Sequence, residues 1–441
     1  MHQSFAPQHL RAIWDAQTRK GDKLLVFYPT VALLFKDRRK AHDEPFLRRS
    51  PMDPAPKNIQ EHYAYVSEKA EKALTAALQI TSASIVNQVS QGTFSWNLQV
   101  SRQLKGRQLY KTGDTAEAFF VDKQLQYILR KLLRNRSDSR QAAVAGLIQT
   151  LGNHMPKLVV RTDIHSFYDS IDHDILRKLI DRQPLTPTIK TLLHAFLREM
   201  STLTGRDTGI PAGVGLSATL AELYVQDLDE TLRKLPRVLY YARYVDDIVL
   251  VFGETYYNEL DASRQLGLID AGLTSISLMR SSDKTHCSSM QSIQVLPRFD
   301  FLGYEISYSG SIKVRLSHVR KQTLHDRVKS TFDVWDREPT PSDGAQKRLA
   351  DRVRFITSNT RLANNKRNAM IGVYFSNPHL TDLDQLRGLD RYLQRRLDTA
   401  RISAPLKDKL MQCSFEQGYK TREMRRWTQF ETDRIKRAWN A

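Results

Sequence analysis

The pattern of hydrophobic and polar positions divides the chain into helical and strand-like segments. Helical periodicity or helix-forming composition predicts helices over residues 8–20, 59–80, 119–133, 139–151 and 258–271. Alternating, β-branched or aromatic residues predict strands over residues 94–100, 107–111, 157–162, 273–279 and 299–308. From about residue 316 the chain is expected to be helical again. This mixture predicts an α+β fold.

Two further segments complete the pattern. The apolar run at residues 24–35 is interrupted by Pro29 and predicts a strand and turn followed by a strand or a helix. It is about half the length that a membrane-spanning helix needs. Beyond residue 316, apolar residues recur every three or four positions and predict one buried helical stripe of Leu324, Val328, Phe332 and Trp335. No charged and apolar leader begins the sequence, so we expect no signal peptide.

Residues 240–252 place two adjacent carboxylates, Asp246 and Asp247, between a Tyr-rich arm and an arm rich in Val, Ile and Leu. Both arms have the composition of strands, which predicts a hairpin with the carboxylates at or near its turn. A solvent-exposed Asp-Asp turn is the ordinary alternative. Here the apolar flanks would bury the hairpin, and buried carboxylates need a cation or hydrogen-bond partners. The pair is therefore a candidate metal site that needs a third carboxylate.

A third carboxylate, Asp163, follows the apolar strand predicted over residues 157–162. It precedes the aromatic pair Phe167 and Tyr168, and Asp172 is expected to cap the next helix. A carboxylate at a strand end, followed by aromatic residues and a turn, is typical of an active site. A capping role for Asp163 is the alternative.

A Gly/Pro-rich loop over residues 209–215 leads into a long amphipathic helix that is expected to end near Pro236. Gly213, Gly215 and Ala218 imitate a dinucleotide-binding fingerprint. No hydrophobic strand precedes them and no βαβ unit follows, which argues against such a site. The glycines instead permit close approach of a nucleotide or a template to the backbone.

Composition favours a nucleic-acid partner. The 441 residues include 67 Lys and Arg against 48 Asp and Glu, which gives a formal net charge of +19 and a pI near 9.8. Such an excess points to a polyanion. Five basic residues follow one another closely at Arg130, Lys131, Arg134, Arg136 and Arg140. Such a run either forms a solvent-exposed face of the protein or contacts phosphate groups. Only Cys287 and Cys413 are present, which fits a reducing cytoplasm and excludes a disulfide framework.

The order of these stretches resembles the palm of reverse transcriptases. The segments that resemble successive family motifs are Asp163 with Phe167-Tyr168, residues 209–217, Tyr244-Val-Asp-Asp247, residues 278–285 with Lys284, and the primer grip Phe301-Leu302-Gly303-Tyr304. The resemblance implies a right-hand polymerase with three parts. These are a mixed N-terminal extension (1–112), fingers and an antiparallel palm (113–310), and a helical thumb with the C-terminal region (311–441).

Several short sequence motifs are similar to those of bacterial defence-associated reverse transcriptases, whose palm is like that of retrons and group II introns. These motifs are Gln3-Ser-Phe5, Arg19-Lys-Gly21, Leu125-Gln-Tyr127 and Ala242-Arg-Tyr-Val-Asp-Asp247. The closest resemblance is to the first polymerases of type-three, two-polymerase antiphage systems. It implies a dedicated non-coding RNA template, a DNA product, dNTPs and a second reverse transcriptase. It implies no membrane and leaves the oligomeric state open.

The resemblance also implies two-metal nucleotidyl transfer. Asp163 and Asp246 would hold two Mg²⁺ ions, with Mn²⁺ as an alternative, and Asp247 and the carbonyl oxygen of Ile164 would add ligands. Tyr168 matches the family's steric gate against a ribose 2′-hydroxyl, and core packing is the alternative for it and for Phe167. Lys284 would protonate the leaving pyrophosphate or is simply a solvated lysine.

Three residues complete the nucleotide site that the resemblance implies. They are Arg140, which would grip the triphosphate, and the loop residues Ala212 and Gly213. Many reverse transcriptases carry Gln where this chain has Ala212, which implies altered fidelity or a fixed template.

Three hypotheses follow. They are an RNA-templated DNA polymerase in phage defence, a template-independent or protein-primed nucleotidyl transferase, and a catalytically silent RNA-binding scaffold. The intact Asp163, Asp246 and Asp247 argue against the scaffold.

Overall fold

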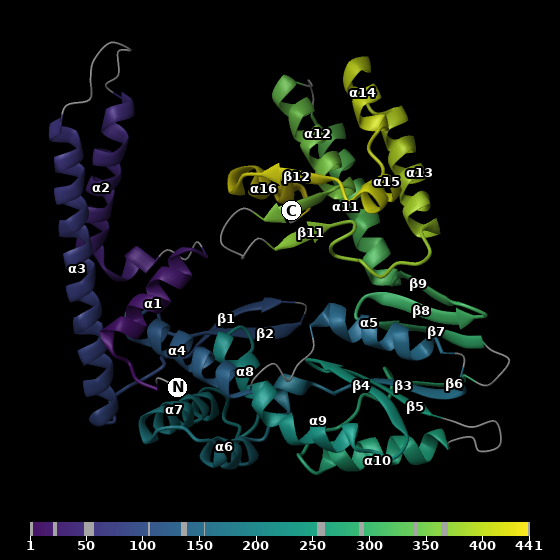
Figure 1. Cartoon of the computed structure of the whole chain (residues 1–441), viewed down its shortest axis with the longest axis horizontal. Helices are drawn as coiled ribbons and strands as arrows, with labels where there is room; N and C mark the ends of the chain where they lie inside the picture. Colours follow the sequence, from purple (N-terminus) through teal and green to yellow (C-terminus); the bar gives the residue numbers. More distant parts are fainter. Residues whose placement is uncertain are drawn as a thin grey trace. The chain divides into compact units, whose positions relative to one another are not determined.

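The computed structural model describes residues 3–20, 24–47, 57–104, 106–133, 139–153, 155–253, 261–290, 295–338, 342–362 and 369–439. Its elements form two compact units, each assembled from separate stretches of the chain (Figure 1). Unit 1 comprises Met1–Arg136, Ser166–Asp227 and Ile276–Leu278, and unit 2 comprises Ser137–His165, Leu228–Ser275 and Met279–Ala441. None of the helices within these described ranges is long and apolar enough to cross a membrane.

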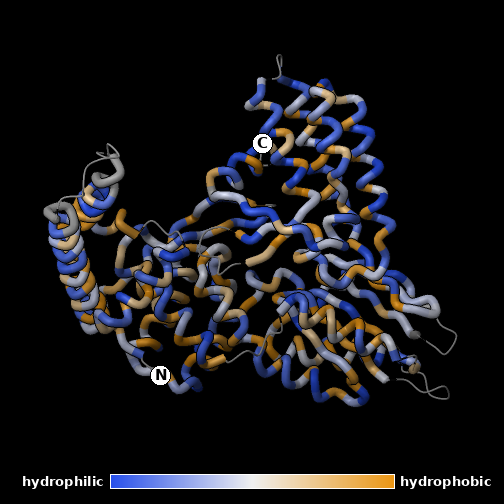
Figure 2. The backbone as a smooth tube through the Cα atoms, turned by 45° about the horizontal axis from the view of Figure 1, so that its top comes forward, coloured by the Kyte–Doolittle hydropathy of each residue, from blue (hydrophilic) through white to orange (hydrophobic). Residues whose placement is uncertain are grey.

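Unit 1 is mainly helical. Its elements are α1 (Pro7–Thr18), η1 (Leu24–Phe27), α2 (Pro29–Leu47), α3 (Lys57–Ser90), β1 (Gln99–Leu104), β2 (Arg107–Lys111), α4 (Ala116–Leu133), η2 (Phe167–Asp169), α6 (His173–Arg182), α7 (Pro187–Thr204) and α8 (Gly215–Tyr224). β1 and β2 pair antiparallel, and α2 lies beside α3. Hydrophilic and hydrophobic positions alternate along this helix pair (Figure 2). Asp172 caps α6 by accepting from the amides of Asp174 and Ile175, as predicted.

Within its described residues, unit 2 contains three sheets and the remaining helices. Its strands are β3 (Lys157–Asp163), β4 (Val238–Tyr244), β5 (Asp247–Gly253), β6 (His286–Met290), β7 (Val295–Phe301), β8 (Tyr304–Ser309), β9 (Ile312–Leu316), β10 (Asn359–Leu362), β11 (Met370–Gly372) and β12 (Met424–Trp427). The helices are α5 (Arg140–Leu151), α9 (Gln226–Arg233, in this unit from Leu228), α10 (Ala262–Thr274), α11 (His318–Asp336), α12 (Asp343–Thr357), α13 (Asp384–Thr399), α14 (Ala404–Met411), α15 (Phe415–Thr421), α16 (Gln429–Lys436) and η3 (Arg437–Trp439).

The central sheet of unit 2 is antiparallel, with strand order β4-β5-β3-β6. Helices α9 and α10 cover one face and α5 lies on the other (Figure 1). Because successive side chains of a strand point to opposite faces, Val159, Val249 and Val251 all face α5. They join a continuous hydrophobic core with β7, β8, β9 and the helices from α11 to α15. This core fixes the register of the strands that end at the predicted carboxylates.

Most predicted elements are confirmed. The helices predicted at 8–20, 59–80, 119–133 and 139–151 correspond to α1, α3, α4 and α5, and the predicted hairpins are β4–β5 and β7–β8. The predicted helix at 258–271 corresponds to α10; its first residues, 258–260, lie outside the described ranges. The mixed α/β architecture with antiparallel sheets is confirmed. Divisions at residues 112 and 310, and the assignment of fingers and thumb, stay predictions.

Several predictions are wrong. The strand predicted over residues 94–100 is absent up to residue 98, and β1 begins only at Gln99. Residues 24–35 contain no strand, since α2 begins at Pro29, a residue favoured in the first helical turn. Residues 273–279 contain no strand, because Leu273 belongs with Ile269 to the buried stripe of α10. The single helix expected after the Gly/Pro loop is two helices, α8 and α9, separated at Val225. The region after residue 316 also contains β10, β11 and β12 among its helices.

Candidate functional site

Two neighbouring strands bring the predicted carboxylates together in unit 2. β3 and β5 pair with Asp163 directly opposite Asp247, so both side chains lie on one face of the sheet. Asp246 lies in the tight turn between β4 and β5, where Val245 has a positive φ of 61°. The amide of Ile164 donates to the carbonyl oxygen of Asp246 at 2.9 Å. This bond ties the turn to the end of β3 and holds three carboxylates at one place.

Two cations neutralise part of this negative charge. Lys284 donates through Nζ to Oδ2 of Asp163 at 2.9 Å, and the hydroxyl of Ser281 donates to the same oxygen at 3.3 Å. Arg161 lies two positions before Asp163 on β3 and forms an ion pair with Asp247. It also donates to the carbonyl oxygen of Lys284 at 3.0 Å. Arg161 therefore links the loop of Lys284 to the sheet.

Burial and mutual repulsion disfavour the ionised carboxylates. Burial raises the pKa of Asp246, and the neighbouring negative charge of Asp163 raises it further. Burial likewise raises the pKa of Asp247, against the opposing charge of Arg161. The hydrogen bond to Asp163 raises the pKa of Lys284, which stays protonated at neutral pH. Such a cluster gains stability from any added positive charge.

The donor set fits a hard divalent cation, because carboxylate oxygens are its preferred ligands and because an ion would relieve the repulsion between Asp163 and Asp246. In the part of the chain that the structure describes, no three His, Cys, Asp or Glu side chains form a preformed metal site. Asp163 and Asp247 are instead bound by Lys284 and Arg161. Ion binding would therefore replace these protein cations as partners of the carboxylates.

A buried ion pair supports the carboxylate turn from the opposite face of the sheet. Arg243 on β4 donates to Oδ1 of Asp229 at 2.8 Å and to Oδ2 at 3.0 Å, and its Nη1 donates to the carbonyl oxygen of Val245 at 2.9 Å. Tyr241 adds a hydrogen bond to Asp229 at 2.6 Å. Arg243 and Asp229 are only 4% and 6% exposed. This cluster therefore fixes the strained residue that precedes Asp246.

A second turn, between β7 and β8, carries the predicted primer grip. Leu302 and Gly303 both adopt positive φ, 47° and 80°. The carbonyl oxygen of Leu302 accepts from Nε of Arg140 at 2.9 Å. The guanidinium groups of Arg140 and Arg320 lie 5.1 Å and 5.7 Å from the ring centre of buried Tyr304. Two arginines thus hold this turn in shape.

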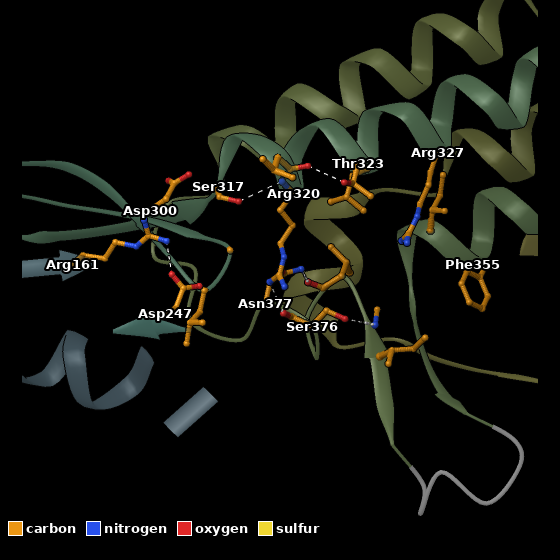
Figure 3. Close-up of a pocket in the computed structure, with 18 residues that line it drawn as sticks. Arg161, Asp247, Asp300, Ser317, Arg320, Thr323, Arg327, Phe355, Ser376 and Asn377 are labelled. Atoms are coloured by element: carbon orange, nitrogen blue, oxygen red, sulfur yellow. Dashed lines mark hydrogen bonds and ion pairs between the residues drawn. The ribbon is translucent and has the colours of Figure 1, made fainter. Parts of the chain in front are cut away.

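A cavity of about 580 Å³ connects the two turns within unit 2. Arg161, Asp247 and Asp300 line one end, and Leu302 and Gly303 line the wall beside it. Figure 3 shows the Arg161–Asp247 pair at one side, Arg320 of α11 in the middle, and Arg327 of the same helix toward the other side. Asp247, which pairs with Asp163 across the sheet, therefore borders a space that is also lined by basic side chains.

The matched family agrees with this geometry. Residues 107–306 match the model of the family described as reverse transcriptase (RNA-dependent DNA polymerase). The chain carries a reverse transcriptase domain. This domain indicates an RNA-directed DNA polymerase, which is a nucleotidyltransferase. No curated protein matches the chain at a significant level.

Four other predicted site residues lie in unit 1, namely Phe167, Tyr168, Ala212 and Gly213. Phe167 is buried, which fits its packing alternative, whereas Tyr168 is half-buried with the Arg107 guanidinium 5.9 Å from its ring centre. The carbonyl oxygen of Ala212 accepts from the amide of Tyr110 at 2.7 Å. Gly213 has a φ of 99°, and a Cβ there would lie 2.8 Å from the Tyr110 carbonyl oxygen. This loop therefore needs glycine for packing, and its nucleotide contacts stay predictions.

Arg140 has hydrogen-bond partners on the backbone of unit 2. Its guanidinium binds the carbonyl oxygens of Leu302 and Ser376, so it supports the primer-grip turn. A triphosphate contact by Arg140 stays a prediction. The neighbouring basic residues Arg134 and Arg136 lie outside the described residues.

Sequence reasoning missed Arg161 and the pair of Arg243 with Asp229. Strand alternation was a usable signal for Arg161, because positions 161 and 163 of one strand share a face. The partners Asp229 and Arg243 are brought together only by packing of α9 on the sheet.

The Gly303→Ala substitution is expected to lower the free energy of unfolding by about 2–3 kcal/mol. Positive φ strains any added side chain, and the new Cβ would lie 2.9 Å from Cζ of Arg320. Arg320 is held by Asn377 at 2.7 Å and has little freedom to move away. Gly310→Ala is the matched control, because Gly310 also has a positive φ but a Cβ added there would meet no atom within 4 Å. Urea unfolding of both variants is the measurement, and equal losses would contradict the close-contact argument.

Proposed function

We propose that this reverse transcriptase domain copies a dedicated non-coding RNA into DNA in antiphage defence, using Asp163, Asp246 and Asp247 as a two-metal centre. The observation that supports it is the β3–β5 register, which joins Asp163 and Asp247 beside the Asp246 turn. Three carboxylates in a basic chain of net charge +19 suit transfer of polyanionic substrates.

Each carboxylate has a distinct proposed role. Asp163 and Asp246 would hold both divalent ions, and Asp247 with the carbonyl oxygen of Ile164 would complete the ligands. When bound, the ions supply activation of a primer 3′-hydroxyl and stabilisation of the charge on the transferred phosphoryl group. Arg161 keeps Asp247 paired and oriented before this exchange of partners.

Lys284 is the proposed proton donor to the leaving pyrophosphate. Its hydrogen bond to Asp163 keeps it charged and close to the carboxylates, since the pKa of Lys284 is raised. Tyr168 is the proposed gate against a ribose 2′-hydroxyl, and its ring is half-buried. The turn of residues 301–304 is the proposed primer grip, braced by Arg140 and Arg320.

The proposed role in antiphage defence and the proposed partners rest on the resemblance of the short sequence motifs. A non-coding RNA and a second reverse transcriptase are the proposed partners, and the cytoplasm is the proposed compartment. Within these motifs, the Gln3 side chain forms hydrogen bonds with the backbone of Pro184 and Thr186, and Phe5 is buried. Both residues therefore also stabilise unit 1. Gly21 lies outside the described residues.

The double substitution Asp246→Asn/Asp247→Asn is expected to abolish incorporation of labelled dNTPs in the presence of Mg²⁺. The amides keep the size of the side chains but remove two negative charges that ion binding needs. Asp326→Asn, at an exposed acid on α11, serves as the control and is expected to retain activity. Unchanged incorporation by the double variant would disprove the catalytic assignment.

A further inference from the structure

A cavity in unit 1 is formed by residues that precede the matched reverse transcriptase domain. Its volume is about 440 Å³, and the elements that line it are η1, α2 and α3. The lining residues are Leu25, Ala32, Phe35, Lys36, Arg38, Arg39, His42 and Tyr63. The match to the family model begins only at residue 107. The cavity has the size of a small-ligand site, which typically measures about 300–1,000 Å³.

One face of α2 supplies most of this lining. The residues on this face are Ala32, Phe35, Lys36, Arg39 and His42. Each lies three or four positions from another, so the five share one side of the helix. Phe35 and His42 contribute rings, and Lys36 and Arg39 contribute positive charge. This face of α2 therefore combines the two components that contact a base and its phosphate.

Two cations on this face have no acidic partner. Lys36 and Arg39 are exposed, and within the described part of the chain neither forms an ion pair. The acid between them, Asp37, has its Oδ1 3.7 Å from Nζ of Lys40 and does not line the cavity. None of the described residues that line the cavity is acidic. Positive charge without a partner, in a chain of net charge +19, favours an anionic ligand here.

The third cation of the cavity, Arg38, is held in place and forms part of the wall. Its Nη1 donates to Oε1 of Glu71 on α3 at 3.0 Å, and Oε2 of Glu71 accepts from Arg11 of α1 at 2.8 Å. A hydrogen bond with Arg38 lowers the pKa of the Tyr63 hydroxyl. The ring centres of Tyr63 and His42 lie 5.8 Å apart, with the rings at 61° to each other. Arg38 thus links α2 to α3 and keeps the Tyr63 ring at the cavity.

We propose that this cavity binds an unpaired nucleotide of a single-stranded RNA, with the base against Tyr63 and the phosphate backbone at Lys36 and Arg39. Proteins bind single strands by combining aromatic rings, on which bases stack, with cations that contact the backbone. A fully paired duplex offers no free base to such a ring. This inference rests on the proposed RNA partner. It adds a site that holds this RNA outside the matched domain, residues 107–306.

The test crosslinks the full chain to a single-stranded RNA that carries one 4-thiouridine, and identifies the crosslinked peptides by mass spectrometry. We expect a crosslink to Phe35 or His42 in addition to crosslinks within residues 107–306. Tyr63→Ala is expected to weaken RNA binding at this cavity about tenfold, which is the scale of losing one stacked base. The yield of the crosslink against RNA concentration measures this change. Tyr63→Phe keeps the ring and is expected to retain the affinity. A crosslink confined to residues 107–306 would overturn the proposal.

The contribution of the cations is tested by Lys36→Gln/Arg39→Gln. Loss of two backbone contacts to a single strand is expected to reduce the slope of log K against log salt at this cavity by about 1.4. Lys69→Gln/Lys72→Gln on α3 is the matched control, because both lysines are exposed and neither lines the cavity. It is expected to leave the slope nearly unchanged. Equal reductions in the two variants would indicate diffuse attraction and would overturn the proposed phosphate contacts.

Other nucleotide sources are distinguished with labelled ATP and with a fully paired RNA duplex. Occupation of the cavity by either ligand as tightly as by the single strand would overturn the proposal. Asp246→Asn/Asp247→Asn is expected to keep the crosslink at the cavity, whereas Lys36→Gln/Arg39→Gln is expected to keep dNTP incorporation on an added primer and template. Failure of the polymerase assignment would therefore leave the crosslink unaffected, and a missing crosslink would leave the polymerase assignment standing.

Discussion

Replacement of Asp163 by Asn is expected to lower Mg²⁺-dependent nucleotide incorporation about a thousandfold or more, while the protein stays folded. Asn keeps the shape of the side chain and can still accept from Ser281. It loses the charge that pairs with Lys284 and would hold the ions. A thousandfold loss corresponds to about 4 kcal/mol of transition-state stabilisation, which is the scale of effect that metal ligation supplies.

The same substitution is expected to leave the free energy of unfolding unchanged or slightly higher. Together with burial, the charge of Asp163 raises the pKa of both Asp246 and Asp247, so its removal relieves repulsion among buried acids. Lost activity with retained stability is the signature of a functional carboxylate. Asp283→Asn, next to Lys284 and exposed, is the control that is expected to stay active. Single-turnover incorporation and thermal unfolding are the two measurements, and more than a tenth of normal activity in Asp163→Asn would contradict the assignment.

Asp229→Ala is expected to lower the free energy of unfolding by about 3–5 kcal/mol. This change leaves the guanidinium of Arg243 buried without its partner and also removes the hydrogen bond from Tyr241. Asp270→Ala is the matched control, because Asp270 pairs with Arg280 in a more exposed ion pair. Exposed pairs contribute about 1 kcal/mol or less, so urea unfolding separates the two variants clearly.

A double variant distinguishes stability from positioning. Asp229→Leu/Arg243→Met removes both charges together and is expected to recover most of the lost stability. It also removes the bond from Arg243 to the carbonyl oxygen of Val245, so incorporation is expected to stay low. Full recovery of incorporation would show that Arg243 is not needed to hold the turn of Asp246. Equal losses in Asp229→Ala and Asp270→Ala would contradict the role of the buried pair.

The carboxylate strands could be predicted because their signals are local. Strand composition on both sides of Asp246 and Asp247 fixed the hairpin, and the apolar run before Asp163 fixed the neighbouring strand. Asp172 was identified as a helix cap from residue type and position alone. Asp163 was expected near Asp247 because the two adjacent carboxylates needed a third ligand for a shared cation. Nothing in the sequence indicated the strand register that places them opposite each other.

The remaining features depend on long-range packing. Residues 273–279 alternate over a few positions, but α10 continues to Thr274 with Ile269 and Leu273 buried, and its Gly272 lies beside Leu228 and Leu232 of α9. The position of Arg140 was unpredictable because its partners, Leu302 and Ser376, lie far along the sequence.

The central claim is that this chain synthesises DNA under the direction of an RNA. The most direct measurement purifies the chain with its bound RNA, supplies Mg²⁺ and all four dNTPs, and sequences both nucleic acids. We predict DNA that is complementary to a segment of the copurified RNA and that disappears after prior RNase treatment. DNA without a complement in that RNA, or synthesis that survives RNase, would contradict the account and favour a template-independent transferase.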